Sequence, residues 1–404
     1  MKIVMLGHKR IPSREGGVEI VVEELSTRMA ALGHDVTVYN RKGSHVAGYS
    51  SIDAPKGDKF EYKGVHVRTA FTFKIKSLNA IVYSFFATRK ACRSKCDVIH
   101  FHAEGPCAMI PYAKKKGKRC VATIHGLDWK RSKWGGFATS FLKYGEKMAA
   151  MHADEVIVLS EADKKYFKKT YNRNVTLIPN GINEPVINSP KVIKLKHALN
   201  GNDYILFVAR IVPEKGVHTL VEAYSKSGIE VPLVIAGGSS HSEEYYKTIK
   251  TFADKFNDMA SRARRKARIV MTGFVQGREL EELYSNAVMY VLPSEIEGMP
   301  ISLLEAMSYG NICLVSDIPE NTSVVGTHGF CFENGSIDSL RDSMRDIVKN
   351  YKQIREQENY SKESISSFVL EKYNWDKIVK KTLSLYKGNK KSKAEEDKEI
   401  KQTE

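Results

Sequence analysis

The stretch PSEIEGMPISLLEAMSYGNICLVSD, residues 293–317, predicts the end of one strand, a helix and a second strand. Pro293 and Ser294 end the apolar run VMYVLPS, and ICLVSD supplies the next apolar run. Between them, Pro300 suits the first turn of a helix and Gly310 suits its end. Apolar runs without polar alternation are expected of strands that are covered on both faces. The stretch therefore predicts one strand–helix–strand passage of a parallel sheet.

The same alternation runs through the chain in two series, which residues 180–203 separate. Strands are expected at 2–7, 35–40, 65–71, 97–102, 120–126, 155–160 and 175–179, and then at 204–210, 232–238, 267–275, 288–294 and 312–317. Repeated strand–helix–strand order predicts an α/β fold with doubly wound parallel sheets. The Pro, Asn and Gly content of 180–203 is typical of a linker. Two α/β halves joined in this way make a cleft between them the expected site.

Helical spacing is clearest in the first helix and near the end of the chain. The first helix is predicted from Val18, Val21, Val22, Leu25, Met29 and Leu32, with Gly33 as its stop. Two more helices are expected at 217–226 and 278–285. The last helix, 374–386, places Trp375, Ile378, Val379, Leu383 and Tyr386 on one face, so we expect it to pack on a domain. The charged tail 389–404 is predicted to be disordered.

Charge is distributed unevenly between the halves. Residues 1–183 contain 32 Lys and Arg against 16 Asp and Glu, so the entire net charge of +16 lies there. A basic half favours an anionic partner, such as a phospholipid surface, a lipid-phosphate acceptor or nucleic acid, although solubility alone is an alternative explanation. No apolar run approaches a membrane span, and none of the six cysteines forms a CxxC pair, so we expect a cytoplasmic protein with reduced thiols.

Glu305 is the only charged residue between positions 301 and 315. A carboxylate in an apolar helix needs hydrogen-bond partners, and either a ligand or a buried basic group would supply them. The carboxyl edge of an open α/β sheet is where ligands bind, and a carboxylate there can accept hydrogen bonds from the two hydroxyls of a ribose. Glu297 lies eight positions earlier in the preceding loop, where it could meet another part of the same ligand.

The E-x7-E pattern of these two residues resembles the signature of retaining glycosyltransferases of family 4, which have the GT-B fold of two Rossmann-like domains facing across a cleft. The preceding Pro-Ser, the Gly after the first Glu and the trailing LLEAMSYG agree with that signature. Met299 and Pro300 stand where the family usually has an aromatic residue and Gly. The stretch VARIVPEKGVHTLVEA, with Arg210 and Lys215, resembles the R-x4-K segment of the family. The resemblance covers residues 1 to about 388.

The resemblance implies a set of site residues. It implies catalytic roles for His125, Arg210, Lys215 and Glu297, and binding of the nucleotide sugar by Gly16, Gly17, Gly238, Phe274, Val275 and Glu305. Two cations at a strand end would stabilise the charge that develops on the leaving diphosphate. Arg14 and Glu15 are further candidates for acceptor contacts. From the residues alone, exposed loop cations, a plain Gly-Gly turn and a structural histidine remain alternatives.

The activity that the resemblance implies is retaining transfer of a sugar from a nucleoside-diphosphate sugar to an acceptor hydroxyl, without a metal or another cofactor. Residues 1–183 would bind the acceptor, 184–370 would bind the donor, and the helix 371–388 would pack on the first domain. UDP is the commonest nucleotide in the family, and a hexose, N-acetylhexosamine or rhamnose all remain open. We expect a lipid-linked saccharide of cell-surface polysaccharide synthesis as acceptor, with peripheral contact to an anionic membrane at its inner face.

Three alternatives share some of these features. Another GT-B enzyme, such as a nucleotide-sugar epimerase or a glycogen-synthase-like polymerase, would have the same cleft. A non-catalytic nucleic-acid-binding protein would have the basic half, but it does not explain Glu297, Glu305, Arg210 and Lys215 together, and we expect no nucleic acid. A sensor would bind the donor without turnover.

The basic runs 113–119 and 261–268 suit solvated helix ends. The aromatic and basic stretch 71–93 suits a bilayer interface or an ordinary amphipathic helix.

Overall fold

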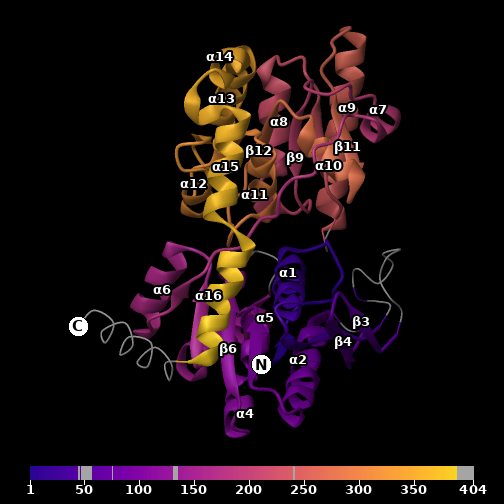
Figure 1. Cartoon of the computed structure of the whole chain (residues 1–404). Coiled ribbons are helices and arrows are strands. Elements are labelled where there is room, and N and C mark those ends of the chain that lie inside the picture. Colours follow the sequence, from indigo (N-terminus) through magenta and orange to yellow (C-terminus); the bar gives the residue numbers. More distant parts are fainter. Residues whose placement is uncertain (44–45, 47–56, 75, 131–134, 240–241, 389–404) are drawn as a thin grey trace, which may run out of the picture. The chain divides into compact units, whose positions relative to one another are not determined.

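The chain forms two compact units. The computed structural model describes residues 1–388, except 44–45, 47–56, 75, 131–134 and 240–241, so the tail predicted to be disordered lies outside the described residues. Unit 1 contains Met1–Gly181 together with the segment that begins at Trp375, and unit 2 is Ile182–Asn374. Each unit is built around one sheet with helices packed against it (Figure 1).

The sheet of unit 1 has eight strands in the order β3-β4-β2-β1-β5-β6-β7-β8. Their bounds are β1 Lys2–Leu6, β2 Asp35–Arg41, β3 Lys59–Tyr62, β4 Val65–Ala70, β5 Val98–His102, β6 Arg119–Ile124, β7 Glu155–Val158 and β8 Thr176–Leu177. All neighbouring pairs are parallel except β3 and β4, which are antiparallel. The strand order reverses at β1, which lies between β2 and β5, so unit 1 is doubly wound as predicted.

The helices of unit 1 follow its strands. They are α1 Gly17–Ala31, α2 Lys76–Arg93, α3 Glu104–Cys107, α4 Ile110–Lys115, α5 Gly136–His152, α6 Glu161–Tyr171 and α16 Trp375–Lys387, with the 3₁₀ turn η1 Asp128–Lys130. α1 confirms the first predicted helix, but the placement of Leu32 on its apolar face is wrong. Leu32 caps the helix and is 57% exposed, because the helix ends one residue earlier.

The sheet of unit 2 has six parallel strands in the order β11-β10-β9-β12-β13-β14. They are β9 Ile205–Val208, β10 Leu233–Ala236, β11 Ile269–Gly273, β12 Met289–Leu292, β13 Ile312–Ser316 and β14 Phe330–Phe332. The helices are α7 Val192–His197, α8 Val217–Ser227, α9 Glu243–Arg262, α10 Arg278–Ser285, α11 Ile301–Ser308, α12 Pro319–Val325, α13 Ile337–Lys349, α14 Tyr351–Arg355 and α15 Lys362–Lys372, with 3₁₀ turns η2 Pro213–Lys215 and η3 Glu358–Tyr360. β9, β10, β12 and β13 are almost completely buried, as their unbroken apolar runs predicted.

Of the elements that the sequence reading did not name, β3, β14 and α7 show most clearly why it missed them. β3 is a four-residue edge strand whose sequence, KFEY, alternates in burial, and β14 has only three residues. α7 lies inside the segment predicted as a linker. The buried carboxylate of Glu282 accepts hydrogen bonds from the backbone N–H groups of Lys191, Val192 and Ile193 and so holds the start of α7. A carboxylate at the amino end of a helix satisfies donors that the helix leaves unpaired.

The apolar face of α16 is buried in unit 1, although the whole of unit 2 precedes it in the sequence. Its Tyr386 hydroxyl lies 2.6 Å from Nδ1 of His100, and Arg119 donates to the carbonyl of Leu385 at 2.7 Å. A Cβ on Gly181 would come within 2.4 Å of the Trp375 ring, so a side chain there would displace the indole.

In the part of the chain that the structure describes, we find no helix that combines the length and the apolar character needed to span a bilayer.

Candidate functional site

The strand order of unit 2 reverses between β9 and β12. From β9 the chain proceeds outward to β10 and β11, whereas from β12 it proceeds in the opposite direction to β13 and β14. At such a reversal the two following loops leave in opposite directions, and the opening at the carboxyl edge of the sheet is the usual ligand site of an open α/β sheet. Arg210 and Lys215 follow β9, and Glu297 follows β12, so the sequence places three predicted residues at this edge.

Lys215 and Glu297 form an ion pair across this edge. Their side chains are only 15% and 6% exposed, so the pair is largely shielded from water. The backbone joins the same two loops, because the N–H of Glu295 donates to the carbonyl of Glu214 at 3.0 Å. Gly216 makes this approach possible: it has φ +65°, and a Cβ there would lie 2.0 Å from the carbonyl oxygen of Pro293.

Glu305 is the fifth residue of α11 and is half-buried. The hydroxyl of Tyr284, on α10, donates to its Oε2 at 3.1 Å. Burial, reinforced by the negative charge of Glu305, raises the pKa of Tyr284 well above its ordinary value, so this phenol remains a proton donor. Tyr284 also stacks on Tyr309, with ring centres 5.4 Å apart. Sequence reasoning missed Tyr284, because nothing in α10 marks it as the partner of an acid on α11.

The predicted nucleotide-binding residues Gly238, Phe274 and Val275 follow the neighbouring strands β10 and β11. The carbonyl of Gly238 accepts a hydrogen bond from Ile211 N–H at 3.0 Å, which joins it to the loop of Arg210. Phe274 is 51% exposed, and Val275 packs on the core of unit 2. Sequence reasoning overlooked the adjacent Gly237, where a Cβ would lie 1.8 Å from the carbonyl oxygen of Ala209.

In unit 1 the Gly16-Gly17 pair is where the sequence placed it, at the start of α1. Gly16 is the N-cap, and a Cβ there would lie 2.1 Å from Oε2 of Glu19. Burial opposes ionisation of Glu19, but the charge of Lys9 and its N–H bond at 2.8 Å outweigh burial and hold the pKa of Glu19 below its ordinary value. Arg14 is paired with Glu24 at 3.5 Å.

His125 follows β6 and belongs to a row of histidines that the sequence reading missed. Its Nε2 lies 3.1 Å from Nδ1 of His102, at the end of β5, and the His102 ring packs 4.1 Å from that of His100. Burial and the neighbouring histidines hold the pKa of His102 well below its ordinary value, and they lower the pKa of His100 to about 3. The pattern DVIHFH carried the available signal, since alternate residues of a strand share a face.

The predicted residues fall into two groups, one in each unit. The group in unit 2 lies at the carboxyl edge of its sheet and contains Arg210, Lys215, Gly238, Phe274, Val275, Glu297 and Glu305. The group in unit 1 contains Gly16 and Gly17, which follow β1, and His125, which follows β6; both loops leave the carboxyl edge of that sheet, with β5 between the two strands. The charged side chains are concentrated in the unit 2 group. Its cations suit phosphate, and its carboxylates suit hydroxyl groups.

Comparisons with known proteins agree with this arrangement. Residues 191–365 match the protein family described as "Glycosyl transferases group 1", and residues 15–184 match the family described as "Glycosyltransferase Family 4". An uncharacterized glycosyltransferase of Methanocaldococcus jannaschii is 26% identical over 96% of this chain and 98% of its own. The UDP-Gal:alpha-D-GlcNAc-diphosphoundecaprenol alpha-1,3-galactosyltransferase of Escherichia coli is 28% identical over 67% of this chain and 70% of its own.

A solved structure of HepE from Anabaena, in complex with UDP and glucose, superposes with a TM-score of 0.76 at 16% identity and covers 95% of this chain and 98% of its own. That likeness concerns the fold, and it extends through both units. The two family matches also fall one on each unit, apart from short margins. The chain belongs to the group 1 glycosyltransferases, with two Rossmann-like domains of the GT-B fold.

Proposed function

We propose that this glycosyltransferase moves a sugar from a UDP-sugar to a hydroxyl of a lipid-linked saccharide, with retention at the anomeric carbon. The observation that carries the proposal is the ion pair of Lys215 and Glu297 at the reversal point of the unit 2 sheet. Arg210 lies on the same loop as Lys215, and Glu305 lies on α11, the helix that follows the loop of Glu297. The choice of UDP and of a lipid-linked acceptor is supported by the names of the Escherichia coli relative and of the HepE complex.

In this proposal the donor is held mainly by unit 2. Glu305 accepts hydrogen bonds from the ribose hydroxyls, while Tyr284 keeps its carboxylate in position. Arg210 and Lys215 bind the diphosphate, which requires Lys215 to exchange part of its contact with Glu297 for phosphate oxygens. Glu297 is then available to the donor sugar. Gly238, Phe274 and Val275 line the base and phosphate region.

The transfer step needs no protein nucleophile. The bond between the anomeric carbon and the diphosphate oxygen breaks, the acceptor oxygen bonds to the same face of that carbon, and the departing phosphate oxygen takes the acceptor proton. Arg210 and Lys215 stabilise the negative charge that develops on the diphosphate. We propose that these cations serve where other enzymes use a metal ion, so turnover should persist in EDTA.

The acceptor is assigned to unit 1, where Gly16, Gly17 and His125 lie at one edge of the sheet. We further propose that the basic excess of residues 1–183 holds the enzyme at an anionic membrane surface, where a lipid-linked acceptor would be found. Flotation with vesicles of phosphatidylcholine, with and without phosphatidylglycerol, tests this. Equal flotation with both would contradict it.

The central experiment is a panel of UDP-sugars, screened by thermal shift and then by turnover on lipid-linked acceptors. We expect at least one UDP-sugar to raise the unfolding temperature, and Glu305→Ala and Lys215→Ala to lose that stabilisation. Unchanged shifts in both variants would reject the assigned pocket. Product analysis separates the nearest alternative, because an epimerase would release an isomerised nucleotide sugar and leave the acceptor unchanged.

A further inference from the structure

An open pocket of about 430 Å³ lies in unit 1 between α2 and the end of α4. It is lined by Phe85, Arg89, Cys92, Arg93, Tyr112 and Lys116. Three of these six side chains are cationic, two are aromatic, and none is acidic. Such a lining suits a group that combines negative charge with an apolar portion.

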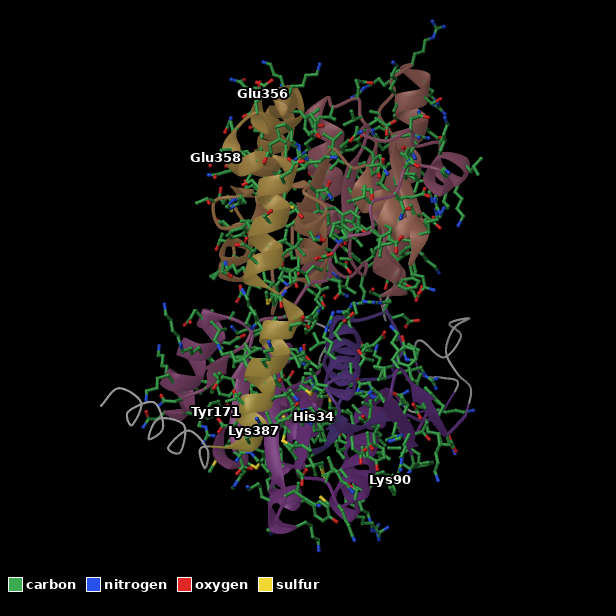
Figure 2. The ribbon with its side chains drawn as sticks, viewed as in Figure 1. His34, Lys90, Tyr171, Glu356, Glu358 and Lys387 are labelled. Atoms are coloured by element: carbon green, nitrogen blue, oxygen red, sulfur yellow. The ribbon has the colours of Figure 1, made fainter. Side chains whose placement is uncertain are left out.

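The three cations of the pocket differ from their basic neighbours. Lys114 pairs with Asp154 at 2.7 Å, Lys118 donates to the carbonyl of Ser94, and Lys90, labelled on α2 in Figure 2, donates to the carbonyl of Thr69 at 2.8 Å. These lysines therefore have structural roles.

Within the described part of the chain, by contrast, Arg89, Arg93 and Lys116 make no ion pair. Three positive charges around one pocket repel one another, and an anion in the pocket would relieve that repulsion.

A row of contacting aromatic rings begins at the pocket. Phe85 packs near Tyr112, with ring centres 6.4 Å apart, and also contacts Phe86 at 5.4 Å. Phe86 contacts Phe71 at 5.4 Å, and Phe71 contacts Phe73 at 5.3 Å. Phe71, Phe73 and Phe85 are 44%, 44% and 41% exposed. Exposed aromatic rings beside unpaired cations are typical of surfaces that meet a membrane interface.

The pocket lies away from the residues proposed to bind the acceptor. The end of α2 is the helix end that precedes β5, and the end of α4 is the one that precedes β6, so the pocket lies toward the amino edge of the unit 1 sheet. The loops of Gly16 and His125 leave the opposite, carboxyl edge. In Figure 1, α4 lies at the far end of unit 1 from the start of α1. The pocket is therefore separate from the acceptor site.

We propose that this pocket binds the phosphate headgroup of an anionic phospholipid, with Arg89, Arg93 and Lys116 on the phosphate oxygens and Phe71, Phe73 and Phe85 toward the acyl region. Arginine can donate two parallel hydrogen bonds to a phosphate, and the ring edges tolerate the interface between headgroup and chain. The inference rests on the membrane contact proposed above and adds one defined headgroup site to it.

The test compares two double variants in the full chain. R89Q/R93Q removes two charges from the pocket. K95Q/K115Q removes two exposed charges outside the pocket lining, one just after α2 and one at the last residue of α4. Affinity is measured by flotation with phosphatidylcholine vesicles containing phosphatidylglycerol. A diffuse attraction would weaken equally in both, since each surface lysine or arginine contributes about 1 kcal/mol. We expect the pocket variant to bind at least about tenfold more weakly than the control.

Cys92 gives a second, site-specific readout. Its rate of alkylation, followed by peptide mass spectrometry against the exposed Cys331 as reference, should fall when phosphatidylglycerol vesicles are added. Equal loss of flotation in both double variants would overturn the headgroup site while leaving the membrane contact standing. Protection of Cys92 by inorganic phosphate as strong as that by vesicles would overturn the lipid assignment in favour of a soluble anion. A wild-type chain that ignores phosphatidylglycerol would refute the membrane contact itself.

Discussion

The pair formed by Lys215 and Glu297 illustrates what single side chains contribute to this enzyme. Each group neutralises the other in a largely buried position, where an isolated charge would be unfavourable. The pair also keeps both groups at the sheet edge before any donor arrives. In the proposed function, a diphosphate that binds Lys215 would compete with Glu297 for the same ammonium group, so the strength of the pair would limit how tightly the donor binds.

Glu297→Gln should separate binding from turnover. The amide keeps the shape of the side chain but removes its charge, so Lys215 is freer to contact the diphosphate. We expect UDP affinity to be unchanged or a few-fold higher, while kcat falls at least about 100-fold because the charge beside the donor sugar is lost. Calorimetric titration with UDP and a turnover assay measure the two effects. A parallel loss of UDP affinity, as expected for Lys215→Ala, would show that Glu297 serves only to position Lys215.

Tyr284→Phe tests the support of Glu305. The variant removes the hydroxyl that donates to the carboxylate and leaves the ring stacked on Tyr309. We expect a loss of about 1 kcal/mol in the free energy of unfolding. We also expect about a fivefold weaker affinity for UDP, because the Glu305 carboxylate that is proposed to bind the ribose is less well held. Tyr204→Phe, at a buried tyrosine outside the site, is the control. If it weakened UDP binding as much as Tyr284→Phe does, the effect would be a general loss of stability.

At this scale the sequence predicted the charged residues and missed their supports. Two spacings in the sequence predicted these residues: the one between Glu297 and Glu305, and the one between Arg210 and Lys215. Tyr284 and Gly237 matter because of contacts with segments far along the chain, and no local pattern records those contacts. The same holds for His102, whose neighbour His125 follows the next strand of the sheet, β6.

Among the elements, the loop that begins after β9 depends most on one backbone conformation. Gly216 follows η2 and precedes α8, and its positive φ turns the chain directly against the end of β12. The loop, the turn and the helix therefore form one support for Lys215. The predicted helices 217–226 and 278–285 match α8 and α10 closely, because both have strong helical spacing and clear ends. α7 was predicted as linker because its start is held by Glu282 on α10, a helix that is far away in the sequence.

Gly216→Ala and Gly228→Ala form a matched pair. Both glycines have positive φ, +65° and +72°, but a Cβ at 228 meets nothing within 4 Å, whereas one at 216 would collide with the Pro293 carbonyl. We expect Gly228→Ala to lower the free energy of unfolding by about 1 kcal/mol and to leave activity unchanged. Gly216→Ala should lose more stability and should also weaken donor binding. Equal effects on binding would show that the close approach is not needed for the site.

For the whole molecule, the buried histidines make unit 1 sensitive to acid. Burial lowers the pKa of His8 to about 4 and that of His100 to about 3, and it holds His102 well below its ordinary range. Below pH 6.5 the unfolded chain therefore binds more protons at these positions than the folded chain does. Stability falls as the pH drops from 6.5 toward the folded-state values, by up to about 1.4 kcal/mol per pH unit for each histidine.

Hydrogen exchange at pH 7.5 and 5.5, corrected for intrinsic rates, can locate this effect. We expect protection in β5 and β6 of unit 1 to decrease at the lower pH more than protection in β12 and β13 of unit 2. His100→Gln should reduce the pH dependence in unit 1. A larger decrease in unit 2 would contradict the assignment to the buried histidines.

The burial of α16 in unit 1 has a consequence for how the protein is made. Unit 2 is continuous in sequence, so a nascent chain can complete it once Asn374 has left the ribosome. Unit 1 begins first but lacks one of its own helices until Trp375–Lys387 has been translated. Until then, the surfaces that receive Trp375 and Tyr386 are uncovered, and premature termination before codon 375 would leave a completed second half joined to an unfinished first half.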